Sequence, residues 1–168
     1  MKIEKKILNP NEVILYFSNP LPIIGCLLKE DANAPEFFSS VSQTLSLKKV
    51  LLTSDFLYIN SPNTATLEDA ELILLAEIED YFLKNAETIS ASPDHTEEKI
   101  ELLLELIIAP FLQKDGGNIR FINLKDNIVS VQFLGKCNGC PYANKTLKER
   151  VEKNLIRYLP QIKEAVLV

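Results

Sequence analysis

The stretch Gly135-Lys136-Cys137-Asn138-Gly139-Cys140-Pro141 places two cysteines three positions apart, between a predicted strand and a predicted helix. The two glycines let the backbone turn tightly, so that both thiols can face one bound metal. The pair cannot complete a four-thiolate site, because the one remaining cysteine, Cys26, lies far upstream in what reads as another domain. If the pair binds a tetrahedral metal or a cluster, two ligands must come from elsewhere, and a second copy of the chain is the simplest donor.

Spacing alone leaves four interpretations of Cys137 and Cys140 open. The favoured one is a metal ion or an iron–sulfur cluster. A structural zinc site usually has both ligand pairs in one chain, and here the second pair is absent. A thioredoxin-like redox pair would follow a strand in a βαβ pattern, whereas this pair follows a predicted hairpin. Inert structural cysteines are usually buried, and a glycine-flanked turn is a poor place for them.

The surrounding residues predict the electrostatics of the pair. Cys140 immediately precedes Pro141, so we expect it at or just before a helix N-terminus, where backbone N–H groups and the helix dipole favour thiolate. Basic residues nearby would help to hold an anionic cluster: Lys136, Lys145, Lys148 and Arg150. They fit a solvated helix face equally well, because glutamates alternate with them.

The second half of the chain predicts the order α-β-β-(CxxC)-α-β. A helix capped near Thr96 should kink at Pro110 and end at Gly116-Gly117. Strands are expected over 119–124, 128–134 and 165–168. The helix opened by Pro141 should bury one apolar stripe: Leu147, Val151, Leu155 and Leu159.

The first half predicts strands over 13–17, 23–28, 48–52 and 56–59, one helix behind Pro35 and another capped by Thr66. We expect a sandwich-like α/β domain with a mainly antiparallel sheet and no catalytic constellation. The small, polar residues 85–96 read as a linker. The predicted class is therefore α+β, with two small domains at 1–84 and 97–168.

The composition and charge of the chain argue against several functional classes. The net charge of −5 lies in residues 1–85, and nothing is basic enough to indicate nucleic-acid binding. No apolar run is long enough to span a bilayer, and the first residues make a poor signal or transit peptide. A cytoplasmic protein with reduced thiols is expected. Cys26 should be a core thiol, His95 a solvated residue and Asp115 a loop residue after a helix.

The second half resembles the C-terminal domain of the NifU family of iron–sulfur scaffold and carrier proteins. The residues that carry the resemblance are Ala109-Pro110, Asp115-Gly116-Gly117, the cysteine stretch, Thr146-Leu147-Lys148 and Pro160 with Ile162. The first half resembles the N-terminal domain of Nfu-type members through Asn9-Pro10-Asn11, Ala34-Pro35, Lys49-Val50 and Asp55-Phe56. The chain departs from the family pattern at Asn118, Lys136 and Tyr142-Ala143.

The resemblance implies a homodimer in which each chain gives Cys137 and Cys140 to one shared 4Fe–4S cluster. It also implies a carrier that receives the cluster from upstream assembly machinery and delivers it to apo iron–sulfur proteins. Such a protein turns over no substrate, so no enzyme is expected. A thiol–disulfide oxidoreductase and a structural zinc-bridged dimer are the alternatives.

Overall fold

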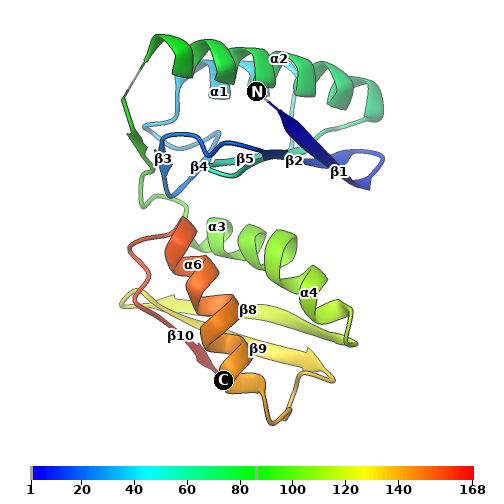
Figure 1. The fold of residues 1–168 in the computed structure, drawn as a ribbon, viewed down its shortest axis with the longest axis vertical. Helices are drawn as coiled ribbons and strands as arrows, with labels where there is room; N and C mark the ends of the chain where they lie inside the picture. The colour runs from blue at the N-terminus through cyan, green and yellow to red at the C-terminus, as the bar shows by residue number, and fades with distance from the viewer. Residues whose placement is uncertain (1, 86) are drawn as a thin grey trace. The chain divides into compact units, whose positions relative to one another are not determined.

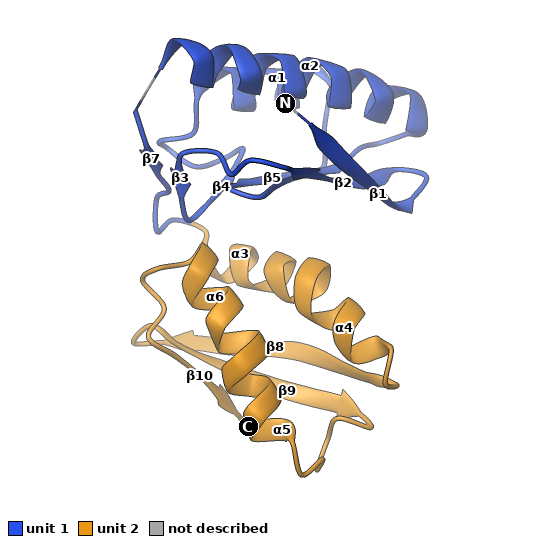
Figure 2. Cartoon of the chain, in the orientation of Figure 1, with its two compact units in different colours: residues 1–94 blue, residues 95–168 orange. Residues whose placement is uncertain are grey.

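The computed structural model describes residues 2–85 and 87–168 and divides into two compact units, residues 1–94 and 95–168 (Figure 2). Each unit combines helices with a sheet, which confirms the predicted α+β class. Within the described residues, no helix has both the length and the apolar character needed to cross a membrane.

The first unit is built on a five-stranded sheet of order β1-β2-β6-β5-β4, in which every neighbouring pair is antiparallel. Helices α1 (Glu36–Thr44) and α2 (Thr64–Lys84) cover one face of this sheet (Figure 1). The strands are β1 (Ile3–Asn9), β2 (Glu12–Phe17), β4 (Cys26–Leu28), β5 (Lys49–Thr53) and β6 (Phe56–Asn60). The sequence predicts all of these elements except β1.

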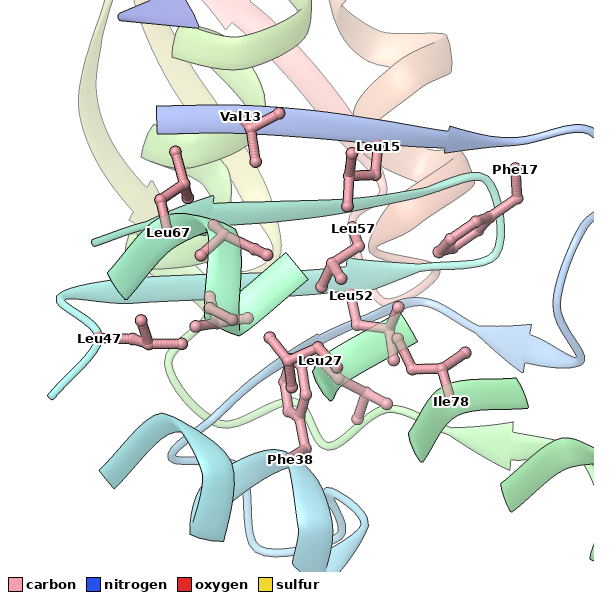
Figure 3. Close-up of a cluster of buried hydrophobic side chains, with 14 of the residues drawn as sticks. Val13, Leu15, Phe17, Leu27, Phe38, Leu47, Leu52, Leu57, Leu67 and Ile78 are labelled. Carbon is pink, nitrogen blue, oxygen red and sulfur yellow. The ribbon is translucent and has the colours of Figure 1, made fainter. Parts of the chain in front are cut away.

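The core of this unit lies between the sheet and the two helices (Figure 3). Val13, Leu15 and Phe17 alternate along β2, so their side chains reach the same face of the sheet. They pack with Phe38 of α1 and with the buried stripe of α2. That stripe consists of Leu67, Ala70, Leu74 and Ile78.

Helix α2 starts earlier than the sequence predicts. Its N-cap is Asn63, whose side-chain oxygen accepts a hydrogen bond of 2.9 Å from the backbone N–H of Thr66. The predicted cap, Thr66, therefore lies inside the first turn and is the donor in this interaction. Asparagine is among the best N-cap residues because its short side chain reaches the exposed N–H groups.

Part of the segment predicted as a linker, residues 85–96, belongs to a small sheet. Ile89–Ser90 forms β7, which pairs in parallel with β3 (Ile23–Ile24). The backbone N–H of Ser92 donates to the Asn33 side chain at 3.1 Å. Residues 89–92 are thus held by the first unit, and residue 86 lies outside the described residues.

The second unit has the predicted order α-β-β-α-β. Its sheet has the order β10-β9-β8, with β8 antiparallel and β10 parallel to β9, and the helices lie on one face (Figure 1). The strands are β8 (Gly117–Lys125), β9 (Ile128–Gly135) and β10 (Glu164–Leu167). The first helical segment comprises α3 (Thr96–Leu103), the π-helical turn η1 (Leu104–Ile108) and α4 (Ala109–Gln113). The second comprises α5 (Ala143–Thr146), π-helical η2 (Leu147–Glu152) and α6 (Lys153–Tyr158).

Pro110 is accommodated by a wide turn just before it. The N–H of Ala109 donates to the carbonyl of Leu104, five residues earlier, as a π-helical turn requires. Proline cannot donate the next helical hydrogen bond, and the wide turn absorbs that irregularity. The helix then continues through α4.

Glu152 ties the last strand to the second helical segment. Its carboxylate accepts hydrogen bonds from the Lys148 ammonium at 2.7 Å and from the backbone N–H of Ala165 at 2.8 Å. Burial alone would raise the pKa of Glu152, but these two hydrogen bonds outweigh burial and hold its pKa below the ordinary value. The structure buries the predicted stripe of this helical segment: Leu147, Val151, Leu155 and Leu159.

Candidate functional site

The two cysteines lie on a loop that connects the end of β9 to the start of α5. The loop is shaped by successive backbone turns. The N–H of Asn138 donates to the Gly135 carbonyl at 3.1 Å, and the N–H of Ala143 donates to the Cys140 carbonyl at 3.0 Å. Gly135 and Gly139 have φ values of +61° and +74°, a region that side chains disfavour. The backbone of the loop therefore depends on glycine at positions 135 and 139.

A second glycine segment supports this loop from the neighbouring strand. Gly117, the first residue of β8, pairs with Gly135, the last residue of β9. The carbonyl of Gly116 accepts a hydrogen bond from the Lys136 N–H at 3.2 Å. A β-carbon at position 135 would lie 2.5 Å from that carbonyl oxygen. The two strand ends can approach this closely because neither bears a side chain there.

Gly117 also makes room for the first cysteine. A β-carbon at position 117 would lie 2.0 Å from the Sγ of Cys137 and 2.9 Å from its Cβ. The thiol therefore occupies the space that a side chain at position 117 would fill. We expected Gly116-Gly117 only to end a helix, and this contact was missed. Its signal in the sequence is that Gly117 precedes the first strand of the predicted hairpin and Gly135 follows the second. An antiparallel hairpin brings these two positions together at one end of the sheet.

The surroundings of Cys137 raise the pKa of its thiol. Partial burial, the neighbouring Cys140 and the carboxylate of Asp115 together raise the pKa of the Cys137 thiol above its ordinary value. The helix begins at Ala143, three residues beyond Cys140. The sequence predicted Cys140 at or just before a helix N-terminus, whereas in the structure Pro141 and Tyr142 separate it from the first residue of α5.

The four basic residues predicted near the pair have different roles. The aliphatic part of Lys136 packs over Gly116, where a β-carbon would lie 3.2 Å from Lys136 Cδ. Lys148 is committed to Glu152 and Glu164, at 2.7 and 2.9 Å. The Arg150 guanidinium stacks over the ring of Phe111, 4.7 Å from its centroid. Lys145 is exposed. Lys148 is thus engaged with η2 and β10, and Arg150 with α4.

The second unit supplies two thiols at this loop, both partly exposed. Cys26 is fully buried in β4 of the first unit, as predicted for a core thiol. His95 is exposed, as expected. Within residues 2–85 and 87–168, no three His, Cys, Asp or Glu side chains are grouped so that they could hold a metal ion. Two further ligands are therefore needed from outside these residues to complete a four-ligand site.

A small cavity of about 70 Å³ lies beside Cys137, lined also by Phe133, Asn138 and Leu167. This is room for about two water molecules. A larger group bound by the two sulfurs would lie on the outer side of the loop. Tyr142 lies at the end of the same loop and is 69% exposed.

Comparison with known proteins finds one matching family model and several similar proteins. Residues 100–166 match the family model described as "NifU-like domain". The chain is 33% identical over 119 residues to the Fe/S biogenesis protein NfuA of Buchnera aphidicola, an alignment that covers 65% of this chain and 60% of the relative. It is 32% identical over 127 residues to the mitochondrial NFU1 iron-sulfur cluster scaffold homolog of Drosophila persimilis, covering 69% of this chain and 45% of that protein.

A third relative aligns with more of the chain. The mitochondrial NifU-like protein 4 of Arabidopsis thaliana is 24% identical over 178 residues, which is 92% of this chain and 61% of the relative. In all three comparisons the chain spans less than two thirds of the length of the relative that it matches.

Proposed function

The second unit of this chain is a NifU-like domain, and from that premise we propose that the protein is an iron–sulfur cluster scaffold or carrier. Cys137 and Cys140 are the proposed cluster ligands. Two chains would each contribute this pair to one shared cluster of the 4Fe–4S type. The cluster would be cargo, received from assembly machinery and delivered to apo iron–sulfur proteins. The proposal assigns no catalytic turnover to the chain.

The observation that carries this proposal is the incomplete set of sulfur ligands on a prebuilt loop. Thiolates are the ligands that iron–sulfur clusters require, and a cubane cluster takes four of them. This chain offers two at the loop, and its third cysteine is buried in the other unit. A twofold dimer supplies the missing pair with the same residues in the same geometry.

The exposure of the loop supports a carrier in particular. Both cysteines are partly exposed, and the cavity beneath Cys137 is too small to enclose a cluster. A cluster shared at the surface of two chains is accessible to an incoming acceptor thiol, whereas a buried one is not. The relatives named as a biogenesis protein and a scaffold homolog are consistent with this role.

The alternative of a thiol–disulfide oxidoreductase is disfavoured by the electrostatics. Attacking thiols in such enzymes have lowered pKa values, whereas the pKa of Cys137 is raised. The proposed ligand role tolerates a raised value, because iron displaces the proton when it binds the sulfur.

The deciding experiment is anaerobic reconstitution with iron and sulfide, followed by desalting, visible absorbance, iron and sulfide analysis and mass measurement in solution. We expect a brown dimer with about four irons and four sulfides per two chains. Cys137→Ser and Cys140→Ser should each abolish it, whereas the matched control Cys26→Ser should retain it.

Three outcomes would reject the shared cluster. A colourless monomer would remove the model and return weight to redox chemistry at the pair. Bound zinc without acid-labile sulfide would indicate a structural zinc-bridged dimer. A full cluster in both ligand variants would exclude Cys137 and Cys140 as ligands.

A further inference from the structure

Helix α2 of the first unit has a second apolar stripe that faces away from the core. Leu72, Ala76 and Leu83 are spaced at i, i+4 and i+11, so they lie on one side of the helix. The side chains of Leu72 and Leu83 are 74% and 81% exposed. They lie opposite the buried stripe that packs on the sheet. A helix with apolar residues on both sides usually has both sides covered.

The stripe borders a groove beside the edge strand β1. A groove of about 260 Å³ is lined by Ile3 of β1 and by Leu72, Leu75, Ala76 and Glu79 of α2. Strand β1 is held against α2 by Lys5, whose ammonium donates to both carboxylate oxygens of Glu71 at 2.7 Å. The single-carbon side chain of Ala76 leaves a hollow beside Leu72 in this groove, where a large partner side chain can insert.

Carboxylates border the stripe on both sides. At 100° per residue, Glu68 and Glu79 lie on one flank of Leu72, and Asp69 and Asp80 lie on the other. Helix α2 contains six acidic residues and one lysine, and that lysine, Lys84, pairs with Asp80 at 2.7 Å. The surface is therefore an apolar strip between two acidic rows.

From this pattern we infer that the outer face of α2 is a docking surface for a basic amphipathic helix of a partner protein. The strip from Leu72 to Leu83 is about 16 Å long, which suits three turns of a partner helix. Leucine-like side chains of the partner would enter the hollow at Ala76. Lysine or arginine residues on either side of its apolar stripe would face the two acidic rows.

Charge argues against two other occupants. In a twofold pair of identical chains, the acidic rows of one α2 would lie against those of the other and repel them. An anionic membrane surface would repel the same carboxylates. Of these three occupants, only a cationic amphipathic helix interacts favourably with both the apolar strip and the acidic rows beside it.

The test uses the full chain without iron or sulfide, so its outcome is independent of the proposed cluster function. The probe is a fluorescent leucine–lysine peptide of about 15 residues, with leucine at i, i+3, i+4 and i+7. Its glutamate counterpart serves as the control peptide. Fluorescence anisotropy gives the affinity at low and at moderate salt.

We expect the lysine peptide to bind the wild-type chain in a 1:1 complex and the glutamate peptide not to bind. Leu72→Ser/Leu83→Ser should weaken binding by at least about tenfold. Glu68→Gln/Asp69→Asn should weaken it less and flatten its salt dependence. The matched control is Ile122→Ser, which removes an exposed apolar side chain from the second unit and should leave binding unchanged.

Four results would overturn the inference. They are absence of peptide binding to the wild-type chain, equal binding by Leu72→Ser/Leu83→Ser, and equal binding of the glutamate peptide. The fourth is evidence that a different molecule binds the outer face of α2. Light scattering that shows a wild-type dimer lost in the double variant would assign the face to a second copy. Sedimentation with phosphatidylserine vesicles, lost in the same variant, would assign it to a membrane. Circular dichroism confirms folding in each case.

Discussion

The sulfur of Cys137 lies in the space that a side chain at position 117 would occupy, 2.0 Å from where the β-carbon of Gly117 would be. Gly117→Ala should therefore displace the cysteine loop. We expect it to destabilise the second unit by about 1–3 kcal/mol, as for other overpacked sites, and to reduce cluster reconstitution strongly. Thermal unfolding and iron–sulfide analysis measure the two effects.

Gly139→Ala is the matched control for that variant. Gly139 also has no side chain and lies on the same loop, but a β-carbon there meets no atom within 4 Å. Only its positive φ opposes the change, at about 1–2 kcal/mol. If Gly139→Ala impaired reconstitution as much as Gly117→Ala, loop strain and not the contact with Cys137 would be responsible.

Asp115→Asn should lower the pKa of Cys137. The Asp115 carboxylate is one of three causes that raise it, after burial and the neighbouring Cys140. Because the thiolate is the reactive form, alkylation of Cys137 should rise with pH to above the ordinary thiol range in the wild type. In Asp115→Asn the whole profile should shift to lower pH, which residue-resolved mass spectrometry of iodoacetamide adducts can follow.

Asp126→Asn provides the comparison for this shift. Asp126 lies in the turn between β8 and β9, at the opposite end of the hairpin from the cysteine loop, and asparagine tolerates its φ of +54°. An equal shift in both variants would mean that net charge, and not the position of Asp115, controls the thiol.

Glu152→Ala should destabilise the second unit by about 1–3 kcal/mol, because the Ala165 N–H loses its acceptor. The pKa of Glu152 is lower in the folded chain than its ordinary value of 4.5. Its contribution is therefore fully present above the unfolded pKa and is lost as pH falls through the folded pKa. Denaturant unfolding across this acidic range should show the loss in the wild type.

Glu152→Gln separates the hydrogen bond from the charge. The amide oxygen can still accept from Ala165, so this variant should be less destabilised than Glu152→Ala. Its stability should also lack the acid-dependent component that Glu152 contributes. If the wild type and Glu152→Gln lost stability in parallel as pH fell, the lowered pKa would have no measurable effect on folding.

Asn63→Ala should destabilise the first unit by about 1 kcal/mol through loss of the α2 N-cap. Thr66→Ala tests the cap position that the sequence favours. Since the Thr66 backbone N–H is the donor and survives the substitution, Thr66→Ala should have the smaller effect in a denaturant titration. The reverse order would place the start of α2 at Thr66.

The spacing of apolar residues was sufficient to predict a helix where only one side of that helix is buried. The stripe of Leu147, Val151, Leu155 and Leu159 repeats at helical spacing, and the structure buries all four. Cys26 could be assigned to the core because apolar residues surround it in a short strand. In both cases neighbours in the sequence carry the signal.

Features that depend on distant or polar partners were not predictable in this way. Strand β1 contains Glu4, Lys5 and Lys6 and lies at a sheet edge, so it lacks the apolar alternation of a buried strand. The contact of Cys137 with Gly117 joins two strand ends that become neighbours only when the hairpin forms. The pKa of Cys137 is raised by burial, by Cys140 and by Asp115, and burial and Asp115 depend on parts of the chain that are distant in sequence.

The hydrogen bond from the Lys136 N–H to the Gly116 carbonyl has a thermodynamic consequence. It belongs to a set of backbone contacts that shape the cysteine loop from the chain's own strands and turns. Zinc fingers, in contrast, gain their fold from the metal and unfold when they lose it. Here the chain's own backbone hydrogen bonds stabilise the loop, in addition to any group that the sulfurs bind. A group that leaves the sulfurs would therefore not take all of the loop's stabilisation with it.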